Sequence, residues 1–137
     1  MERVFVDTDI ILDLLANREP FYIYSASIFS MADNREIEIN VSSLSFSNLN
    51  YILSRQFWSI QAKKKLLKFK TLVTVLSVTD KVIDLALSSD FKDFEDAIQY
   101  FTATKNNIKT LLTRNLKDYK SAEIPVMTAE HFLKSRG

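Results

Sequence analysis

Short apolar runs alternate along the chain with segments of helical periodicity. The run Val4–Val6 ends at acidic residues and predicts a buried strand, and apolar positions within 10–15 then recur at helical spacing. Residues 17–20 are expected to end this first helix. Segment 36–41 alternates apolar and polar residues with period two, which predicts a second strand.

The rest of the chain continues this alternation. The further predicted strands are 73–78, 110–112 and 125–127. The further predicted helices are 21–33, a helix capped within 42–45 that continues through 46–53, then 60–72, 80–88, 93–106 and 129–134. Strands that alternate with helices are typical of a parallel sheet covered on both faces. The pattern therefore predicts the α/β class, as a three-layer α/β/α arrangement with a central, mostly parallel sheet of about five short strands.

A single domain, 1–137, is expected to account for the whole chain. The sequence contains no internal repeat, low-complexity stretch or linker rich in Ser and Pro. Its 137 residues are 47% apolar and 26% charged, which is typical of a globular protein with a substantial core. The formal net charge is only +1, so any contact with nucleic acid is expected at one local patch.

Three residue types are scarce, which excludes several kinds of chemistry. The chain has no cysteine, which excludes thiol catalysis, disulfides and cysteine-bound zinc. The only glycine is Gly137, which excludes a glycine-rich phosphate-binding loop, and the single histidine, His131, cannot form a zinc site that needs several histidines. The start of the chain lacks the apolar core of a signal peptide, and no apolar run reaches the roughly 18 residues of a membrane span. We therefore expect a soluble, cytoplasmic protein with no membrane partner.

Polar residues that are far apart in the sequence are predicted to meet at one edge of the sheet. They are Asp7 after the first strand, Thr113, Asn115 and Asp118 after strand 110–112, and Asp93 and Asp96 at the start of helix 93–106. Open parallel sheets bind ligands beyond the carboxyl ends of their strands. Hard oxygen ligands hold Mg²⁺ or Mn²⁺, which can activate water for phosphodiester hydrolysis without histidine or cysteine.

Four segments resemble PIN-domain proteins, a family that includes the VapC-type toxins of bacterial toxin–antitoxin pairs. Segment 4–15 resembles the opening strand and helix of the family, and segment 41–49 resembles the serine-rich start of its third helix. Segment 93–98 resembles a later helix with an Asp-Ala pair, and segment 113–119 resembles the closing turn. The four segments have the order and spacing of the family and span nearly the whole chain.

The resemblance implies roles for individual residues. Asp7, Asp96 and Asp118 would be the catalytic residues that bind Mg²⁺ or Mn²⁺, and Thr113 and Asn115 would line the site. Asn48 stands where many family members have a glutamate, so one negative charge is missing at that position. Asp9 replaces a usual asparagine and could restore part of that charge.

Each acidic candidate also has a structural interpretation. Asp93 could be the N-cap of its helix and Asp96 a first-turn acid that favours the helix dipole. Asp7 could cap the first helix, and Asp118 could be a turn residue. Glu95 lies about one hundred degrees around the helix from Asp96 and is expected in solvent.

Basic residues near the predicted edge are candidates for contacts with phosphate. Arg114 and Lys117, with Lys120, flank the predicted site and are expected to contact RNA phosphates. The lysine run 63–65 forms a basic stripe on another helix, where a solvated helix face is the simpler interpretation. Asp13 is expected on the surface.

The leading functional hypothesis is a Mg²⁺- or Mn²⁺-dependent ribonuclease similar to VapC-type toxins. The resemblance implies products with a 5′-phosphate and a 3′-hydroxyl, a homodimer and inhibition by an antitoxin protein. The alternative is a catalytically weakened PIN-like module that binds RNA or a protein without cleavage, which Asn48 favours. A phosphotransfer domain is a weaker hypothesis, because Asp7 and Asp9 are followed by Ile10 rather than by the expected Gly-Thr.

Overall fold

The structure is a computed structural model that describes residues 1–136. The predicted domain 1–137 also includes Gly137, which lies outside the described residues. The strands are β1 (Glu2–Val6), β2 (Ile37–Ser42), β3 (Thr74–Leu76), β4 (Leu111–Leu112) and β5 (Val126–Met127). They form one sheet in the order β3-β2-β1-β4-β5, and all four neighbouring pairs are parallel. The predicted sheet of about five short strands is therefore confirmed.

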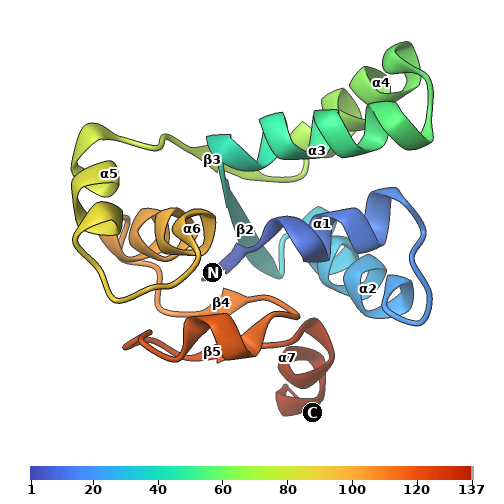
Figure 1. The fold of residues 1–137 in the computed structure, drawn as a ribbon. Helices are drawn as coiled ribbons and strands as arrows, with labels where there is room; N and C mark the ends of the chain where they lie inside the picture. Colours follow the sequence, from blue (N-terminus) through green and yellow to red (C-terminus); the bar gives the residue numbers. More distant parts are fainter. Residues whose placement is uncertain (137) are drawn as a thin grey trace.

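Helices cover both faces of this sheet. They are α1 (Thr8–Leu15), α2 (Tyr22–Asp33), α3 (Ser43–Gln56), α4 (Ser59–Lys70), α5 (Asp80–Leu87), α6 (Phe94–Lys105) and α7 (Ala129–Ser135), with a short 3-10 helix, η1 (Leu116–Tyr119). Figure 1 shows α5 and α6 on one side of the strands and α1, α2 and α7 on the other. This is the three-layer α/β/α arrangement that the sequence predicts, with η1 as an element that it does not. Within residues 1–136, no helix is long and apolar enough to cross a membrane.

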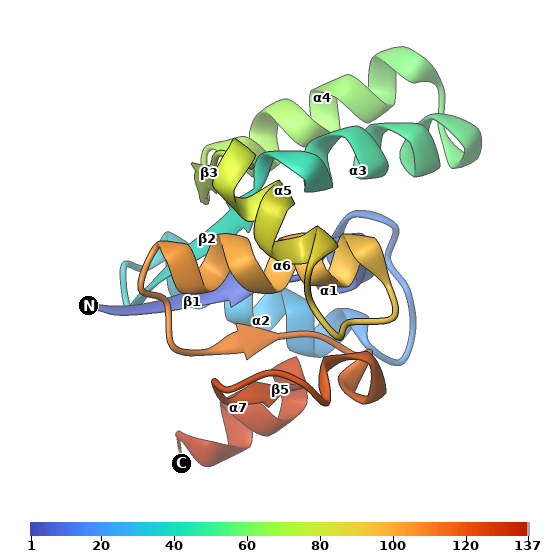
Figure 2. The same cartoon turned by 60° about the vertical axis from the view of Figure 1, so that its left-hand side comes forward.

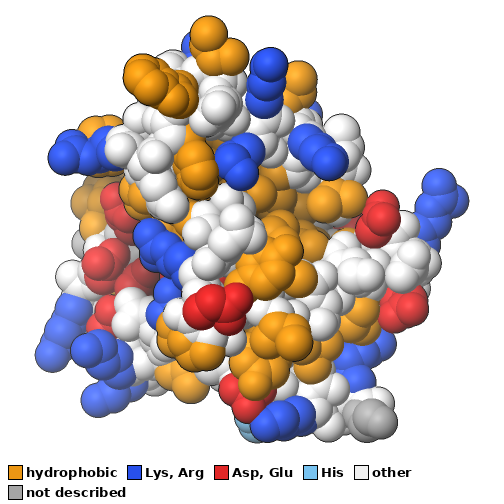
Figure 3. All heavy atoms as spheres, turned by 90° about the vertical axis from the view of Figure 1, so that its right-hand side faces the viewer, with side chains coloured by type: hydrophobic (Ala, Val, Ile, Leu, Met, Phe, Trp, Pro, Cys, Tyr) orange, Lys and Arg blue, Asp and Glu red, His pale blue; other side chains and the backbone are white. Residues whose placement is uncertain are grey.

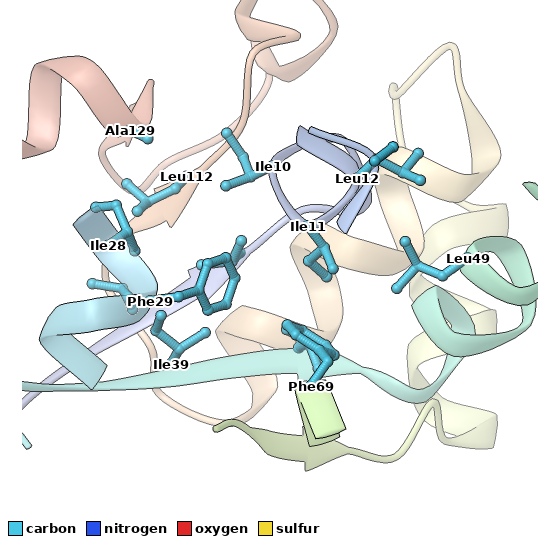
Figure 4. Close-up of a cluster of buried hydrophobic side chains, with 14 of the residues drawn as sticks. Ile10, Ile11, Leu12, Ile28, Phe29, Ile39, Leu49, Phe69, Leu112 and Ala129 are labelled. Carbon is cyan, nitrogen blue, oxygen red and sulfur yellow. The ribbon is translucent and has the colours of Figure 1, made fainter. Parts of the chain in front are cut away.

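The residues of β1 are buried because both faces of the sheet are covered. Val4 and Val6 pack into the larger apolar cluster, whereas Phe5 packs into a second cluster with residues of α6. Successive side chains of a strand point to opposite faces, so a continuous apolar run is what a sheet between two helical layers requires. Figure 4 shows the larger cluster, in which the rings of Phe29 and Phe69 lie 5.4 Å apart.

The register of the parallel strands brings the ends of β1 and β4 to one edge. Val6 pairs with Leu112. The next amide along β1, Asp7 N, donates to Leu112 O at 2.9 Å, and Thr113 N donates to Met127 O at 3.0 Å. Asp7 and Thr113 therefore leave the sheet side by side. The chain winds outward from β1 in one direction through β2 and β3 and in the other through β4 and β5, which makes this edge the switch point where open α/β sheets bind ligands.

Candidate functional site

A cleft of about 600 Å³ opens at the carboxyl edge of the sheet. It lies among the start of α1, the middle of α3, the first turns of α6 and the turn after β4. Its lining residues are Asp7, Thr8, Asp9, Leu12, Ser47, Asn48, Tyr51, Ile52, Glu95, Asp96, Gln99 and Asn115. Acidic side chains gather in a recess at the left edge of Figure 3, with basic side chains close to them.

The carboxylate of Asp7 lies at the centre of this site. Its side chain is only 7% exposed, so its two oxygens need donors from the protein. Oδ1 accepts from Thr8 N at 2.7 Å and from Gln99 Nε2 at 3.2 Å. Oδ2 accepts from Thr113 Oγ1 at 2.9 Å and from Tyr119 Oη at 3.1 Å. Asp7 is thus the N-cap of α1 and also the residue that joins four segments of the chain.

Asp96 and Asp118 are linked to Asp7 through shared donors. Tyr119 Oη, which donates to Asp7, also lies 3.5 Å from Asp96 Oδ1. Asn115 Nδ2 lies 3.4 Å from Asp96 Oδ2 and also donates to Asp118 Oδ2. The structure therefore brings the three predicted metal ligands together around two neutral side chains.

Gln99 and Tyr119 are site residues that the sequence analysis missed. Gln99 is 2% exposed, and its Nε2 donates to Asp7, to Thr8 Oγ1 at 3.2 Å and to Ser45 Oγ at 3.0 Å. Gln99 follows Asp96 by three residues on α6, so the two side chains share a helix face. That spacing was the available signal, and it points to a residue that fixes the orientation of Asp7.

Concentrated negative charge raises the proton affinity of the site. Burial, and then the charges of Asp7, Asp93 and Asp118, raise the pKa of Asp96 to about 7. Burial, and then the charge of Asp7, raise the pKa of Asp9 to about 6. Burial, and then the charges of Asp7 and Asp96, also raise the pKa of Tyr119, so its hydroxyl remains a donor at neutral pH.

The donor set fits a hard divalent cation in its chemistry. Every candidate ligand is an oxygen, which is the ligand type that Mg²⁺ and Mn²⁺ prefer. Asp9 Oδ1 is buried and has no hydrogen-bond partner within the described residues, and Asp9 Oδ2 accepts from Arg114 N at 3.0 Å. Across residues 1–136, no group of three acidic or histidine side chains is close enough to hold an ion by itself, and the predicted ligands are linked only through Asn115 and Tyr119.

Asp93 adopts the structural role that was considered for it. It is the N-cap of α6, and its Oδ1 accepts from Asp96 N at 3.0 Å. It does not belong to the residues that line the cleft. Its charge nevertheless raises the pKa of Asp96, so it contributes to the electrostatics of the site.

Glu95 is exposed, as expected, and it also borders the cleft. Its side chain is exposed, but Oε2 accepts from Asn48 Nδ2 at 3.4 Å, so the two side chains connect α6 to α3. Successive residues on a helix point about 100° apart, yet the cleft is wide enough to be lined by both Glu95 and Asp96. A carboxylate from α6 therefore lies beside the amide at position 48.

Asp13 and Arg114 form an ion pair, and the expectation for Asp13 is wrong. Asp13 is fully buried rather than on the surface. Its carboxylate accepts from Arg114 Nε at 2.7 Å and from Nη2 at 3.0 Å, and this hydrogen bonding raises the pKa of Arg114. The guanidinium also lies 4.0 Å from the centre of the Phe21 ring. Because it is held outside the cleft, the predicted contact of Arg114 with RNA phosphate has no support in this geometry.

Comparison with known proteins places the chain in a family. Residues 3–117 match the PIN domain. The chain belongs to the PIN-domain family, as the resemblance in its sequence indicates. It is 32% identical over 139 residues to ribonuclease VapC1 from Aquifex aeolicus (strain VF5), a match that covers 96% of this chain and 93% of that protein.

Solved structures share the fold at lower sequence identity. The chain is similar to a structure of VapBC2 from Rickettsia felis bound to a DNA fragment from their promoter, with a TM-score of 0.69, 19% identity and coverage of 91% of this chain and 96% of that one. It is also similar to VapC20 from Mycobacterium tuberculosis, described as a sarcin-ricin loop cleaving toxin, with a TM-score of 0.67, 16% identity and coverage of 89% and 98%. These similarities confirm the predicted PIN-like fold.

The ion pair leads to a prediction about stability. Replacing Arg114 by Met should lower the free energy of unfolding by about 3–5 kcal/mol, because it leaves the charge of Asp13 buried without a partner. Asp13→Asn should lower the free energy of unfolding by less, because the side chain of Arg114 is 30% exposed and its charge can reach water. Urea denaturation of both single variants and the double variant measures the coupling. Additive costs in the double variant would show that the two residues do not stabilise each other.

The raised pKa of Asp96 leads to a prediction about pH. The folded state binds a proton at Asp96 more tightly than the unfolded chain, since the pKa rises from 3.8 to about 7. The free energy of unfolding in EDTA should therefore decrease as the pH rises from about 4 to about 7. Asp96→Asn should remove part of this decrease, on the order of a few kcal/mol, in urea denaturation at several pH values. The prediction is wrong if the variant and the wild type show the same dependence on pH.

Proposed function

We propose that this protein is a divalent-metal-dependent endoribonuclease and the toxin of a toxin–antitoxin pair. The observation that carries the proposal is the convergence of Asp7, Asp96 and Asp118 through shared donors at the switch point of the sheet. Its family membership and its identity to a protein named as a ribonuclease support the same activity. The substrate class is RNA, and the products would carry a 5′-phosphate and a 3′-hydroxyl.

Some residues of the site would bind the cation, and others would orient those ligands. Asp7, Asp96 and Asp118 would hold Mg²⁺ or Mn²⁺, which when bound polarises a phosphodiester and lowers the pKa of the attacking water. Asp9 would add negative charge close to Asp7. Thr113 would keep Oδ2 of Asp7 in a fixed orientation, since its hydroxyl donates to that oxygen at 2.9 Å.

The neutral donors between the carboxylates would control how closely these acids approach a cation. Asn115 Nδ2 lies between Asp96 and Asp118, and Tyr119 Oη lies between Asp7 and Asp96. Tyr119 is buried and protonated, so it offsets repulsion between two acids without adding a charge. These contacts keep charged groups close together that would otherwise separate.

A second candidate function is a PIN-like module that binds RNA or a protein without cleaving. The amide of Asn48 favours it, because an amide adds no charge to hold a cation and cannot act as a base. The carboxylate of Glu95 offsets this missing charge, since its Oε2 lies 3.4 Å from Asn48 Nδ2 in the same cleft. The arrangement therefore supplies an acid on the side of the cleft where Asn48 lacks one, and we favour the nuclease.

Partners and location follow from the same proposal. A structural neighbour is named as VapBC2 bound to promoter DNA, and by analogy this chain would be inhibited by an antitoxin protein. We further propose a homodimer that acts on cytoplasmic RNA. Lys117, exposed on η1, would contact RNA phosphate.

Cleavage of RNA tests the nuclease directly. Wild type should cut a mixed panel of single-stranded RNAs with Mn²⁺ or Mg²⁺, and EDTA should abolish cutting. Asp7→Asn and Asp96→Asn should each reduce the rate by at least a factor of about 100, because each removes a ligand charge. Glu123→Gln, on a segment outside the cleft, is the control. Cutting that survives both site substitutions would end the proposal for these residues.

Asn48→Glu tests whether position 48 faces the cation. It should tighten Mn²⁺ binding in calorimetry roughly five- to tenfold, since one added charge contributes about 1 kcal/mol through a partly solvated gap. In EDTA the same variant should have a lower melting temperature, because the new carboxylate would lie beside Glu95. Gln61→Glu adds the same charge on exposed α4 and is the control. Unchanged Mn²⁺ affinity in Asn48→Glu would place position 48 away from the cation.

A further inference from the structure

A second hollow of about 340 Å³ lies beside the acidic cleft. It is formed by the loop that precedes α6 and by η1 with the residues that follow it, two segments that Figure 2 shows next to each other. Its lining includes three lysines, Lys92, Lys117 and Lys120, all of which are exposed. Two acids, Asp90 and Asp118, also line it.

The hollow and the cleft meet at one pair of residues. Asp118 lines the hollow, and its Oδ2 accepts from Asn115, which lines the cleft. Asn115 Nδ2 also lies 3.4 Å from Asp96. An extended polymeric ligand that passes from the hollow into the cleft would therefore reach the acidic site directly.

Aromatic packing fixes the hollow relative to the site. The ring of Phe91, which lines the hollow, lies 5.1 Å from the ring of Tyr100 and 5.8 Å from the ring of Tyr119. Tyr119 in turn donates to Asp7 at 3.1 Å. The segments that carry the lysines thus pack on the same side chain that orients the central carboxylate, so the distance between the two regions is set by the core.

The three lysines are available to a ligand. Among residues 1–136, none of them belongs to the ion pairs, which join Arg3 to Glu38, Arg114 to Asp13, Lys134 to Glu130 and Arg136 to Glu2. A net charge of +1 gives the protein little general attraction for a polyanion, and the acidic cleft itself repels one. RNA therefore needs a local group of cations next to the cleft, and this hollow provides it.

We propose that Lys92, Lys117 and Lys120 bind the phosphates of the single-stranded RNA segment next to the scissile bond. This inference rests on the proposed function, and it extends the contact proposed for Lys117 to a binding groove. Lysine binds phosphate as a flexible point charge, which suits contacts that do not depend on base sequence.

The lysine run 63–65 on α4 provides a matched control. Lys63 and Lys64 are exposed, and Lys65 Nζ lies 4.6 Å from the centre of the Phe57 ring. Replacing all three by glutamine changes the net charge by the same amount as replacing the three lysines of the hollow. None of the three lines the hollow or the acidic cleft.

The experiment measures binding of a labelled single-stranded RNA by fluorescence anisotropy at several salt concentrations. Both triple glutamine variants are made in the Asp7→Asn background, so that the RNA stays intact. Each lost phosphate contact should reduce the slope of log affinity against log salt by about 0.7, so the hollow variant should lose roughly 2 units of slope and at least tenfold in affinity at low salt. The 63–65 variant should keep the slope of its parent. Equal losses of RNA affinity and salt slope in both variants, or no loss in the hollow variant, would overturn the proposed RNA-binding groove.

Two further measurements separate this inference from the nuclease proposal and from a protein ligand. With Asp7 restored, the hollow variant should still be stabilised by Mn²⁺ in thermal unfolding, and its KM for RNA should rise much more than its kcat falls. RNA binding that depends on the hollow in a protein that never cleaves would support the groove and reject the nuclease. If the hollow variant no longer binds a labelled polyglutamate peptide but still binds RNA, the surface binds protein and the inference is wrong.

Discussion

The buried carboxylate of Asp7 is the constraint on which the site depends. A carboxylate at the end of a covered strand cannot reach enough water, so the protein must supply its hydrogen-bond donors. These donors come from Thr8, Gln99, Thr113 and Tyr119, which belong to α1, α6, the turn after β4 and η1. Satisfying one side chain therefore positions four segments, and those segments carry the other acids.

The sequence predicts much of this arrangement because the relevant signals are local. The apolar run before Asp7 and the short strand before Thr113 identify two buried strands, and alternation with helices makes them parallel. Parallel strands end at one edge, so the meeting of Asp7 and Thr113 follows from the order of elements, and the hydroxyl of Thr113 donates to Asp7. Asp96 lines the same cleft, since its helix begins at this edge and leads into β4.

Other residues could not be predicted because their surroundings are set by packing between distant segments. Asp13 follows an apolar stripe and looks like a surface acid, yet Arg114, which is 101 residues away, makes its burial tolerable. That pairing also occupies the guanidinium of Arg114, whose contact with RNA phosphate stays a prediction. Glu95 is exposed as expected, but its place on the border of the cleft could not be predicted, because the position of α3 decides which side chains of α6 face the cleft. Tyr119 ends the segment 113–119 that resembles the closing turn of the family, but its hydrogen bond to Asp7 could not be predicted, because the 3-10 helix that holds it was not predicted.

The charges of the clustered acids and of the neighbouring lysines affect the binding of both cation and RNA. Burial is the first cause of the raised pKa of Asp96, and repulsion by the carboxylates of Asp7, Asp93 and Asp118 is the second. A divalent cation would relieve that repulsion and would also reduce the repulsion between the cleft and an RNA strand. If the proposed function holds, cation and RNA must therefore strengthen each other's binding by the same factor, because the coupling between two ligands is reciprocal. Lysines inside the cleft would weaken the binding of the divalent cation, because like charges repel. This gives a physical reason why the lysines lie in a hollow beyond Asn115.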